Sequence, residues 1–272
     1  MSTQPLVLVT GATDGIGRQT ALDIARAGAA VIIHGRRAEG IAATREWLLR
    51  EVHGATVHEA RADLASLDGI RALGADLTAR FARLDAVIHN AGVFMKERVL
   101  TRDGFETTFA VNHLAPFLLT HLLIGPLAAA RGRVVNVSSI AHSRAAMDFS
   151  NLQGERQFAG YDAYARSKLA NVLFTVELAR RVASRGITTN ALHPGVVGTK
   201  LLREGFGSNG SESLAEGAAT SVFLAISPDV AGVTGKYFSQ RREAVPSRLA
   251  GDDALARRFY EFSAEAVGVE PL

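Results

Sequence analysis

The sequence predicts an α/β fold, with a doubly wound, seven-stranded parallel sheet and helices on both faces. Short apolar segments rich in strand-forming residues alternate with segments of helical periodicity along the 272 residues. The first apolar segment runs directly into a glycine-rich turn that opens a helix. This alternation is typical of parallel strands joined by crossover helices. No linker or internal repeat divides the chain, so we expect a single domain over residues 1–272.

The expected elements follow from the spacing of apolar residues. Strands are expected over residues 6–10, 30–34, 56–60, 85–89, 133–137, 188–192 and 234–238. Helices are expected over residues 15–28, 38–52, 66–82, 104–127, 160–184 and 212–226, with a further helix over 252–266. Residues 203–213 lack clear periodicity and contain three glycines, so we expect a loop there.

Composition restricts the classes of function. The hydrophobic content of 47% is enough for one large core, and 30 basic residues against 27 acidic ones give a net charge of only +3 without a basic cluster. We therefore expect no nucleic-acid surface. The chain has no cysteine and no histidine or acidic spacing typical of a metal site. Nothing resembles a signal peptide or a membrane span, which predicts a cytoplasmic protein without an anchor.

The glycine-rich turn predicts a site for a pyrophosphate group. It follows the apolar residues 6–10 and has glycines at positions 11, 15 and 17. Without Cβ atoms, backbone N–H groups and the positive end of the helix dipole can approach a phosphate closely. The residues expected at this site are Gly11, Thr13, Asp14, Gly15, Ile16 and Gly17.

Tyr164 and Lys168 form the second chemical signal. They stand four residues apart at the start of a helical pattern, so both side chains should share one face. A phenol titrates near pH ~10, and a neighbouring ammonium favours the phenolate. The pair therefore predicts a tyrosine whose pKa is lowered for proton transfer.

Four motifs occur together in order: Thr-Gly-x-x-x-Gly-Ile-Gly at the N-terminus, Asn90-Ala91-Gly92, Asn136-Val137-Ser138-Ser139, and Tyr164-x-x-x-Lys168. With them the chain, from residue 6 to about 240, resembles the short-chain dehydrogenase/reductase family. Residues 111–114, 117–120, 167–174 and 193–195 resemble its retinol-dehydrogenase-like branch. The resemblance implies a Rossmann fold and an NAD(P)-dependent oxidoreductase that interconverts a carbonyl and an alcohol. It also implies a dinucleotide-binding half over about 1–140 and a catalytic, substrate-binding half over about 141–272.

The resemblance implies a catalytic tetrad of Asn112, Ser139, Tyr164 and Lys168. Tyr164 would exchange the proton, Ser139 would donate to the substrate oxygen, and Lys168 would hold the nicotinamide ribose and lower the tyrosine pKa. Pro116 has no N–H to donate to the Asn112 carbonyl four residues earlier, so the helix should kink there. The kink could serve a water site on that carbonyl or could merely fit the sheet.

The end of the second strand favours NADP(H) over NAD(H). No acid stands there to accept from a ribose hydroxyl, whereas Arg36 and Arg37 could pair with a 2′-phosphate. Asp14 could cap its helix or repel that phosphate, which keeps NAD(H) open. Asp63 could contact the adenine or cap the helix that follows. The remaining cofactor contacts that the resemblance implies are Leu64, Asn90, Ala91, Gly92, Pro194, Gly195, Val197 and Thr199.

The substrate is expected to be a lipophilic small molecule. Besides Ser139 and Tyr164, the residues expected to face it are His142, Phe94, Phe149, Leu201 and Phe206. The 24 residues between Ser139 and Tyr164 include an insert over 145–160, which we expect to form part of the pocket wall. The loop over 203–213 matches the position of the family's mobile substrate lid.

Two other classes of function remain open. A non-catalytic NADP-sensing regulator could keep the glycine-rich turn but would not need Ser139, Tyr164 and Lys168 together. An epimerase or dehydratase would use the same Tyr-Lys pair with a different glycine spacing and a larger C-terminal domain. The resemblance also implies a homodimer or homotetramer formed through the helices that carry Asn112 and Tyr164.

Overall fold

The computed structural model describes residues 4–272 and contains one twisted sheet between two layers of helices. The strands are β1 (Leu6–Val9), β2 (Ala30–Gly35), β3 (Val57–Arg61), β4 (Ala86–His89), β5 (Arg133–Val137), β6 (Thr188–His193), β7 (Lys236–Ser239) and β8 (Arg242–Glu243). They lie in the order β3-β2-β1-β4-β5-β6-β7-β8, and all neighbours are parallel except β7 and β8. The predicted fold class is confirmed.

The predicted number of seven strands is wrong by one short antiparallel strand. Gln240 and Arg241 have φ values of 50° and 62°, which turn the chain back so that β8 pairs with β7. A two-residue turn with positive φ matches the twist of a hairpin. The two residues of β8 are charged and carry no apolar pattern, so no local pattern indicates a strand there.

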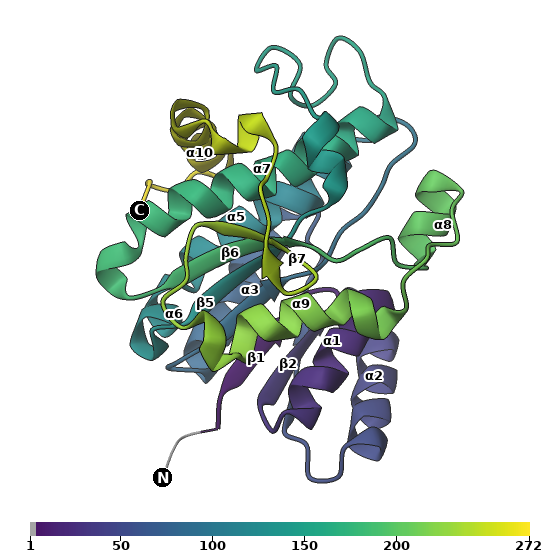
Figure 1. Cartoon of the computed structure of the whole chain (residues 1–272), viewed down its shortest axis with the longest axis vertical. Helices are drawn as coiled ribbons and strands as arrows, with labels where there is room; N and C mark the ends of the chain where they lie inside the picture. The colour runs from purple at the N-terminus through teal and green to yellow at the C-terminus, as the bar shows by residue number, and fades with distance from the viewer. Residues whose placement is uncertain (1–3) are drawn as a thin grey trace.

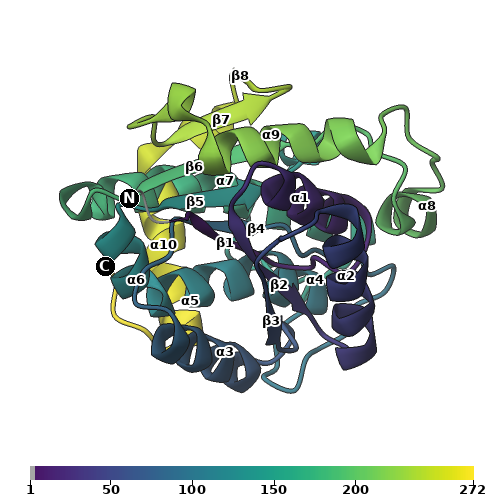
Figure 2. The ribbon, with the colours of Figure 1, turned by 90° about the horizontal axis from the view of Figure 1, so that it is seen from below.

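Alternate residues of the strands enter separate cores on the two faces of the sheet. Leu8 and Ile32 belong to one buried cluster, whereas Val7 and Val9 belong to the other. The first cluster lies under α3 (Leu67–Arg80), α5 (Ala115–Leu122) and α7 (Gly160–Arg181). The second lies under α1 (Gly15–Arg26), α2 (Ala38–Glu51) and α9 (Leu214–Ile226). Figure 2 shows these two layers from below.

The long helix expected over 104–127 is divided into several segments. These are α4 (Thr107–Phe109), the π-helical segment η1 (Ala110–Leu114), α5, and α6 (Ile124–Ala130) after a 64° bend. Next to Pro116, the Ala115 N–H donates to the Ala110 carbonyl in a π turn around Asn112, so the helix is π-helical where the sequence predicted a kink. Within the described residues no single helix is long and apolar enough to cross a membrane; the bent helices 107–122 and 124–130 reach that threshold only when counted together.

The expected C-terminal helix is α10 (Asp253–Val267), which lies across α7 and α5 (Figure 1). Its Phe259 and Tyr260 are buried. Tyr260 Oη lies 2.9 Å from His121 Nε2, and Ser263 Oγ lies 2.8 Å from His113 Nε2. Part of the surface that the resemblance assigned to a partner subunit is therefore covered by the chain's own helix.

Candidate active site

A cavity of about 1040 Å³ runs along the carboxyl ends of the strands from the glycine-rich turn to Tyr164. This edge of a doubly wound sheet is where such folds bind ligands. Most residues predicted for cofactor, catalysis or substrate line it. The four predicted residues that do not are Arg37, Asn112, His142 and Phe149. Among residues 4–272, no group of three or more histidine and acidic side chains is arranged to hold a metal ion.

The glycine-rich turn is packed so tightly at Gly11 and Gly17 that neither position has room for a side chain. A Cβ on Gly17 would lie 2.3 Å from the Gly11 carbonyl oxygen and 2.3 Å from Asn90 Nδ2. Gly11 has φ +64°, and a Cβ there would lie 2.9 Å from the Cα of Ala91. Asn90 Nδ2 donates to the Thr10 carbonyl over 2.9 Å, which ties the end of β4 to the turn. The result is a backbone cradle of the kind that a pyrophosphate requires.

The two acidic residues near the turn differ in what they bind. Asp14 is the N-cap of α1 and accepts from the Gly15 N–H over 2.7 Å, so of its two predicted roles the structure shows the cap. Asp63 accepts from the Ala65 N–H over 3.0 Å, whereas α3 is capped by Ser66. Asp63 is therefore not the helix cap, and its carboxylate lines the cavity.

The end of β2 separates the two arginines. Arg36 lines the cavity, whereas Arg37 occupies the N-cap position of α2 outside it. The sequence reading missed His34, which lies buried beneath the turn and accepts from the Gly11 N–H at Nδ1 over 3.3 Å. Burial lowers the pKa of His34 to about 4, so the ring is neutral and can accept this bond. His34 is a polar residue inside an otherwise apolar strand, and this feature of the sequence could have indicated its role.

Tyr164 and Lys168 lie on one face of α7, with exposed fractions of 8% and 4%. Lys168 Nζ donates to the Val137 carbonyl over 2.9 Å and lies 5.5 Å from the centre of the tyrosine ring. Burial raises the pKa of Tyr164 to about 12, although the Ser139 side chain opposes this, and burial lowers the pKa of Lys168 to about 8. The protein groups alone thus do not produce the lowered tyrosine pKa that the spacing predicted, because desolvation of the buried phenol outweighs its hydrogen bond with Ser139.

The two adjacent serines have different surroundings. Ser139 is the N-cap of the 3-10 helix η2 (Ile140–Arg144), and its Oγ accepts from the Ala141 N–H over 3.2 Å. The Ser139 side chain also hydrogen-bonds Tyr164, so its hydroxyl and the phenol lie side by side at the cavity, where both can reach one ligand oxygen. Ser138 Oγ is buried and donates to the Lys168 carbonyl over 2.7 Å, which is a structural contact.

Asn112 holds the site together without facing the cavity. Its Oδ1 accepts from the Val93 N–H over 2.8 Å, and its Nδ2 donates to the Val93 carbonyl over 3.0 Å. Nδ2 also donates to Ser167 Oγ over 3.0 Å. The side chain therefore joins the loop after β4 to the helix of Tyr164 and Lys168.

The end of the cavity near Tyr164 is aromatic and apolar. The ring of Phe206 lies 4.7 Å from that of Phe94 and 5.2 Å from that of Tyr164. Phe206 ends α8 (Lys200–Phe206), whose N-cap Thr199 accepts from the Leu202 N–H over 3.2 Å. Part of the predicted 203–213 loop is thus helical, because Thr199 caps a short helix that the glycine-rich composition concealed.

The predicted substrate residue Phe149 points away from the cavity. Its ring lies 6.4 Å from Phe259 and 6.1 Å from Phe262 of α10, beneath the guanidinium of Arg258. None of residues 145–160, all of which the structure describes, lines the cavity. The expectation that the insert forms the pocket wall is therefore wrong.

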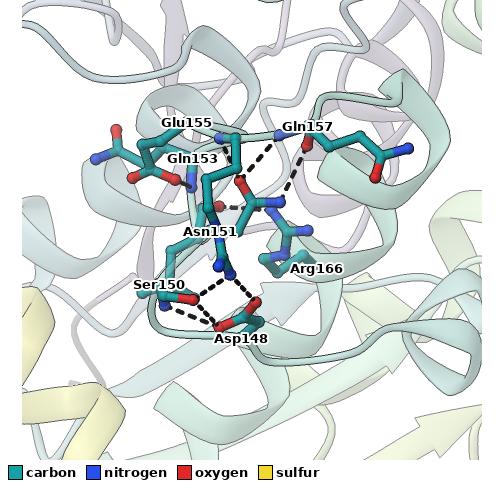
Figure 3. Close-up of polar contacts among 9 residues, drawn as sticks. Asp148, Ser150, Asn151, Gln153, Glu155, Gln157 and Arg166 are labelled. Atoms are coloured by element: carbon teal, nitrogen blue, oxygen red, sulfur yellow. Dashed lines mark hydrogen bonds and ion pairs between the residues drawn. The ribbon is translucent and has the colours of Figure 1, made fainter.

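The insert is instead held by its own polar contacts (Figure 3). Asn151 Nδ2 donates to the Gln157 carbonyl over 3.0 Å, and Ser150 Oγ donates to Asp148 Oδ1 over 2.6 Å. From α7, Arg166 donates to the Leu152 carbonyl over 2.7 Å. These bonds fasten the insert to the outer side of the helix that carries Tyr164.

Known proteins resemble this chain over most of its length. A family model for short chain dehydrogenases matches residues 5–209. The chain is 41% identical to retinol dehydrogenase 13 of Homo sapiens, covering 97% of this chain and 85% of that protein. It is likewise 41% identical to retinol dehydrogenase 14 of Mus musculus, covering 97% and 86%.

Two solved structures extend the comparison. An uncharacterised protein from Mycobacterium paratuberculosis has a TM-score of 0.82 at 28% identity, covering 99% of this chain and 96% of that one. A Beutenbergia cavernae protein, described as an NAD(P)-dependent gluconate 5-dehydrogenase with NADP at low occupancy, has a TM-score of 0.72 at 28% identity, covering 87% and 94%. The chain belongs to the short-chain dehydrogenase/reductase family, in its retinol-dehydrogenase-like branch. It is an NAD(P)-dependent oxidoreductase acting on carbonyl and alcohol groups.

Proposed function

We propose that this protein is an NADP(H)-preferring reductase of lipophilic carbonyl compounds, with Tyr164 as the general acid. The observation that carries the proposal is one continuous cavity with a glycine cradle at one end and Ser139, Tyr164 and Lys168 beside an aromatic wall at the other. The first end fits a dinucleotide, and the second fits a reaction that needs a proton donor in a dry site.

The residues present fit a bound NADP(H). The turn from Gly11 to Gly17 would hold the pyrophosphate, since a Cβ at either end would strike neighbouring protein atoms and distort the cradle. Arg36 lines the cavity at the end of β2 and would pair with a 2′-phosphate. Asp14 accepts the Gly15 N–H as a helix cap, which gives its carboxylate a role other than contact with a cofactor hydroxyl or phosphate. A bound nicotinamide would supply the hydride to the substrate carbon.

The side chains of Tyr164, Ser139 and Lys168 would supply the proton that the substrate oxygen takes up during reduction. Burial keeps Tyr164 protonated at neutral pH, so it can donate to the oxygen of a carbonyl that is being reduced. Ser139, whose side chain hydrogen-bonds Tyr164, would turn its hydroxyl to the same oxygen, which fixes the carbonyl next to the phenol. Lys168, anchored by the Val137 carbonyl, would steady the ribose and stabilise the phenolate left behind. In the direction of alcohol oxidation, the same phenolate would take the hydroxyl proton.

The wall around Tyr164 supports a lipophilic substrate. Phe94, Leu201 and Phe206 pack against the cluster of Tyr164 and Ala141 at the cavity. Similar proteins are named retinol dehydrogenases, which fits an elongated apolar alcohol or aldehyde. Since α10 covers part of α5 and α7, we propose that any homodimer or homotetramer forms through surfaces that α10 leaves free.

Replacing Tyr164 by Phe tests the proposal. We expect the turnover of an aldehyde, ketone, steroid and retinoid panel with NADPH to fall by about 100-fold or more, because the general acid is lost. Tyr161→Phe is the matched control, since Tyr161 also lines the cavity but should keep full turnover. Full turnover by Tyr164→Phe on any substrate of the native protein would overturn the assignment.

A further inference from the structure

His142, which the sequence placed at the substrate, has a different environment in the structure. Its side chain is only 2% exposed and does not line the cavity. Nδ1 lies 2.7 Å from the Ser139 carbonyl oxygen, and Nε2 lies 3.0 Å from the backbone nitrogen of Ser247. Tyr237 of β7 packs on the ring at 4.8 Å between centroids. The imidazole therefore connects the serine loop after β5 to the segment between β8 and α10.

The two partners fix the form of the ring. A carbonyl oxygen can only accept, so Nδ1 must carry the hydrogen, whereas a backbone N–H can only donate, so Nε2 must be bare. Burial lowers the pKa of His142, which keeps the ring neutral in this tautomer. The other neutral tautomer and the protonated ring would each place a hydrogen against the Ser247 N–H. The bridge therefore requires one tautomer and one orientation of the ring.

We propose that His142 is a positioning residue that holds the backbone of Ser139, and hence the direction of its hydroxyl, by bracing it against Ser247. This rests on the proposed role of Ser139 as donor to the substrate oxygen. Ser139 Oγ is already directed by the Ala141 N–H of the same short helix, so a shift of its carbonyl would turn the hydroxyl. The C-terminal segment thereby contributes to the active site without entering the cavity.

The chain offers a variant that breaks the far end of the bridge. Ser247 has φ −62°, which is the value that proline adopts, so Ser247→Pro removes the N–H without a change of φ. The proline Cδ takes the place of that hydrogen, and because the two nitrogens are only 3.0 Å apart, the His142 ring must also move away. Ser247→Ala is the matched control, because it keeps the N–H and removes a hydroxyl with no bonded partner among the described residues. His142→Asn keeps a donor at the position of Nδ1 but cannot reach Ser247.

We expect Ser247→Pro to lower kcat by about tenfold, as small misplacements of reacting groups do, with KM for NADPH unchanged and Ser247→Ala near wild type. His142→Asn should lower kcat by a similar factor. In the Ser247→Pro/His142→Asn double variant kcat should fall no further than in either single variant, since the two substitutions break the same bridge. Additive losses, or equal kcat for Ser247→Pro and Ser247→Ala, would overturn the proposal.

A second measurement does not depend on turnover. Imidazole ¹⁵N spectra should show His142 protonated at Nδ1, and Ser247→Pro should move the Nε2 signal together with the amide and Cβ signals of Ser139. Ser247→Ala should move neither. Unmoved Ser139 signals in Ser247→Pro would overturn the inference while leaving the proposed function intact. A native protein without turnover on the carbonyl panel, but with these shifts, would instead remove the proposed function.

Discussion

The glycine-rich turn and the serine loop both follow strands that end at the cavity, but they are held in opposite ways. The turn depends on missing atoms, because any Cβ at Gly17 would strike the Gly11 carbonyl and Asn90. The serine loop depends on added atoms, because His142 bridges Ser139 to Ser247 more than a hundred residues later. We therefore expect cofactor binding to weaken when atoms are added to the turn. We expect the positioning of Ser139 to weaken when atoms are removed from its bridge to the C-terminal segment.

The largest effect is expected from Phe259→Ala in α10. Phe259 is 0% exposed and packs against Phe109 and His113, so truncation should leave a cavity and lower the free energy of unfolding by about 3–5 kcal/mol. Urea denaturation measures this. Phe206→Ala, the same change in the short helix α8, should cost less than half as much. Equal losses would show that α10 is no more firmly part of the core than α8.

The next effect is expected from adding one carbon to the turn. Gly17→Ala should weaken NADPH binding by about 100-fold or more, equivalent to about 2.7 kcal/mol, because the Cβ displaces the cradle. Fluorescence titration with NADPH measures the affinity. In Gly251→Ala the new Cβ meets no atom within 4 Å, so its affinity should equal that of the native protein. Native affinity in Gly17→Ala would contradict the argument from missing space.

A smaller effect should separate Arg36 from Arg37. Arg36→Ala should weaken NADPH binding by about tenfold, since a charge-assisted hydrogen bond to the 2′-phosphate is lost. Arg37→Ala should change it by less than about threefold, because Arg37 lies outside the cavity and retains only a long-range effect. NADH binding should be unaltered in both variants. A larger loss from Arg37→Ala would place the phosphate beyond the cavity seen here.

The most gradual expected effect is a pH dependence of stability. Burial lowers the folded-state pKa of Lys168 from 10.5 to about 8, so between these values the unfolded chain holds a proton that the folded protein has released. Stability should therefore rise with pH in this window, with a slope of up to about 1.4 kcal/mol per pH unit. Burial also raises the pKa values of Tyr164, Tyr237 and Tyr260, and these phenols oppose the rise from about pH 9 upward, where they begin to ionise in the unfolded chain.

Urea unfolding at pH 8 and pH 10 measures the slope. Lys168→Met should lose it, because the titrating group is gone, while Lys200→Met should keep it, because Lys200 lies on the exposed side of α8. The same slope in Lys168→Met and in the native protein would show that another group is responsible.

Those features of the fold and the site that depend on the spacing of neighbouring residues could be predicted from the sequence. Strand-helix alternation predicts the sheet, the glycines at 11, 15 and 17 predict the turn, and a separation of four residues places Tyr164 and Lys168 on one helical face. They depend only on the periodicity of apolar residues and on the missing side chains of the glycines. Both can be identified from residues that are close together in the sequence.

The direction in which individual side chains point, and how deeply they are buried, became known only from the three-dimensional structure. Arg36 and Arg37 are adjacent, yet one faces the cavity; His142 and Phe149 look like substrate residues, yet they pack against Ser247 and α10. The tyrosine pKa is likewise raised rather than lowered, because burial is set by segments far away in the sequence. The direction of a side chain and the desolvation of a titratable group depend on the packing of the whole fold. They therefore cannot be predicted from a local sequence pattern.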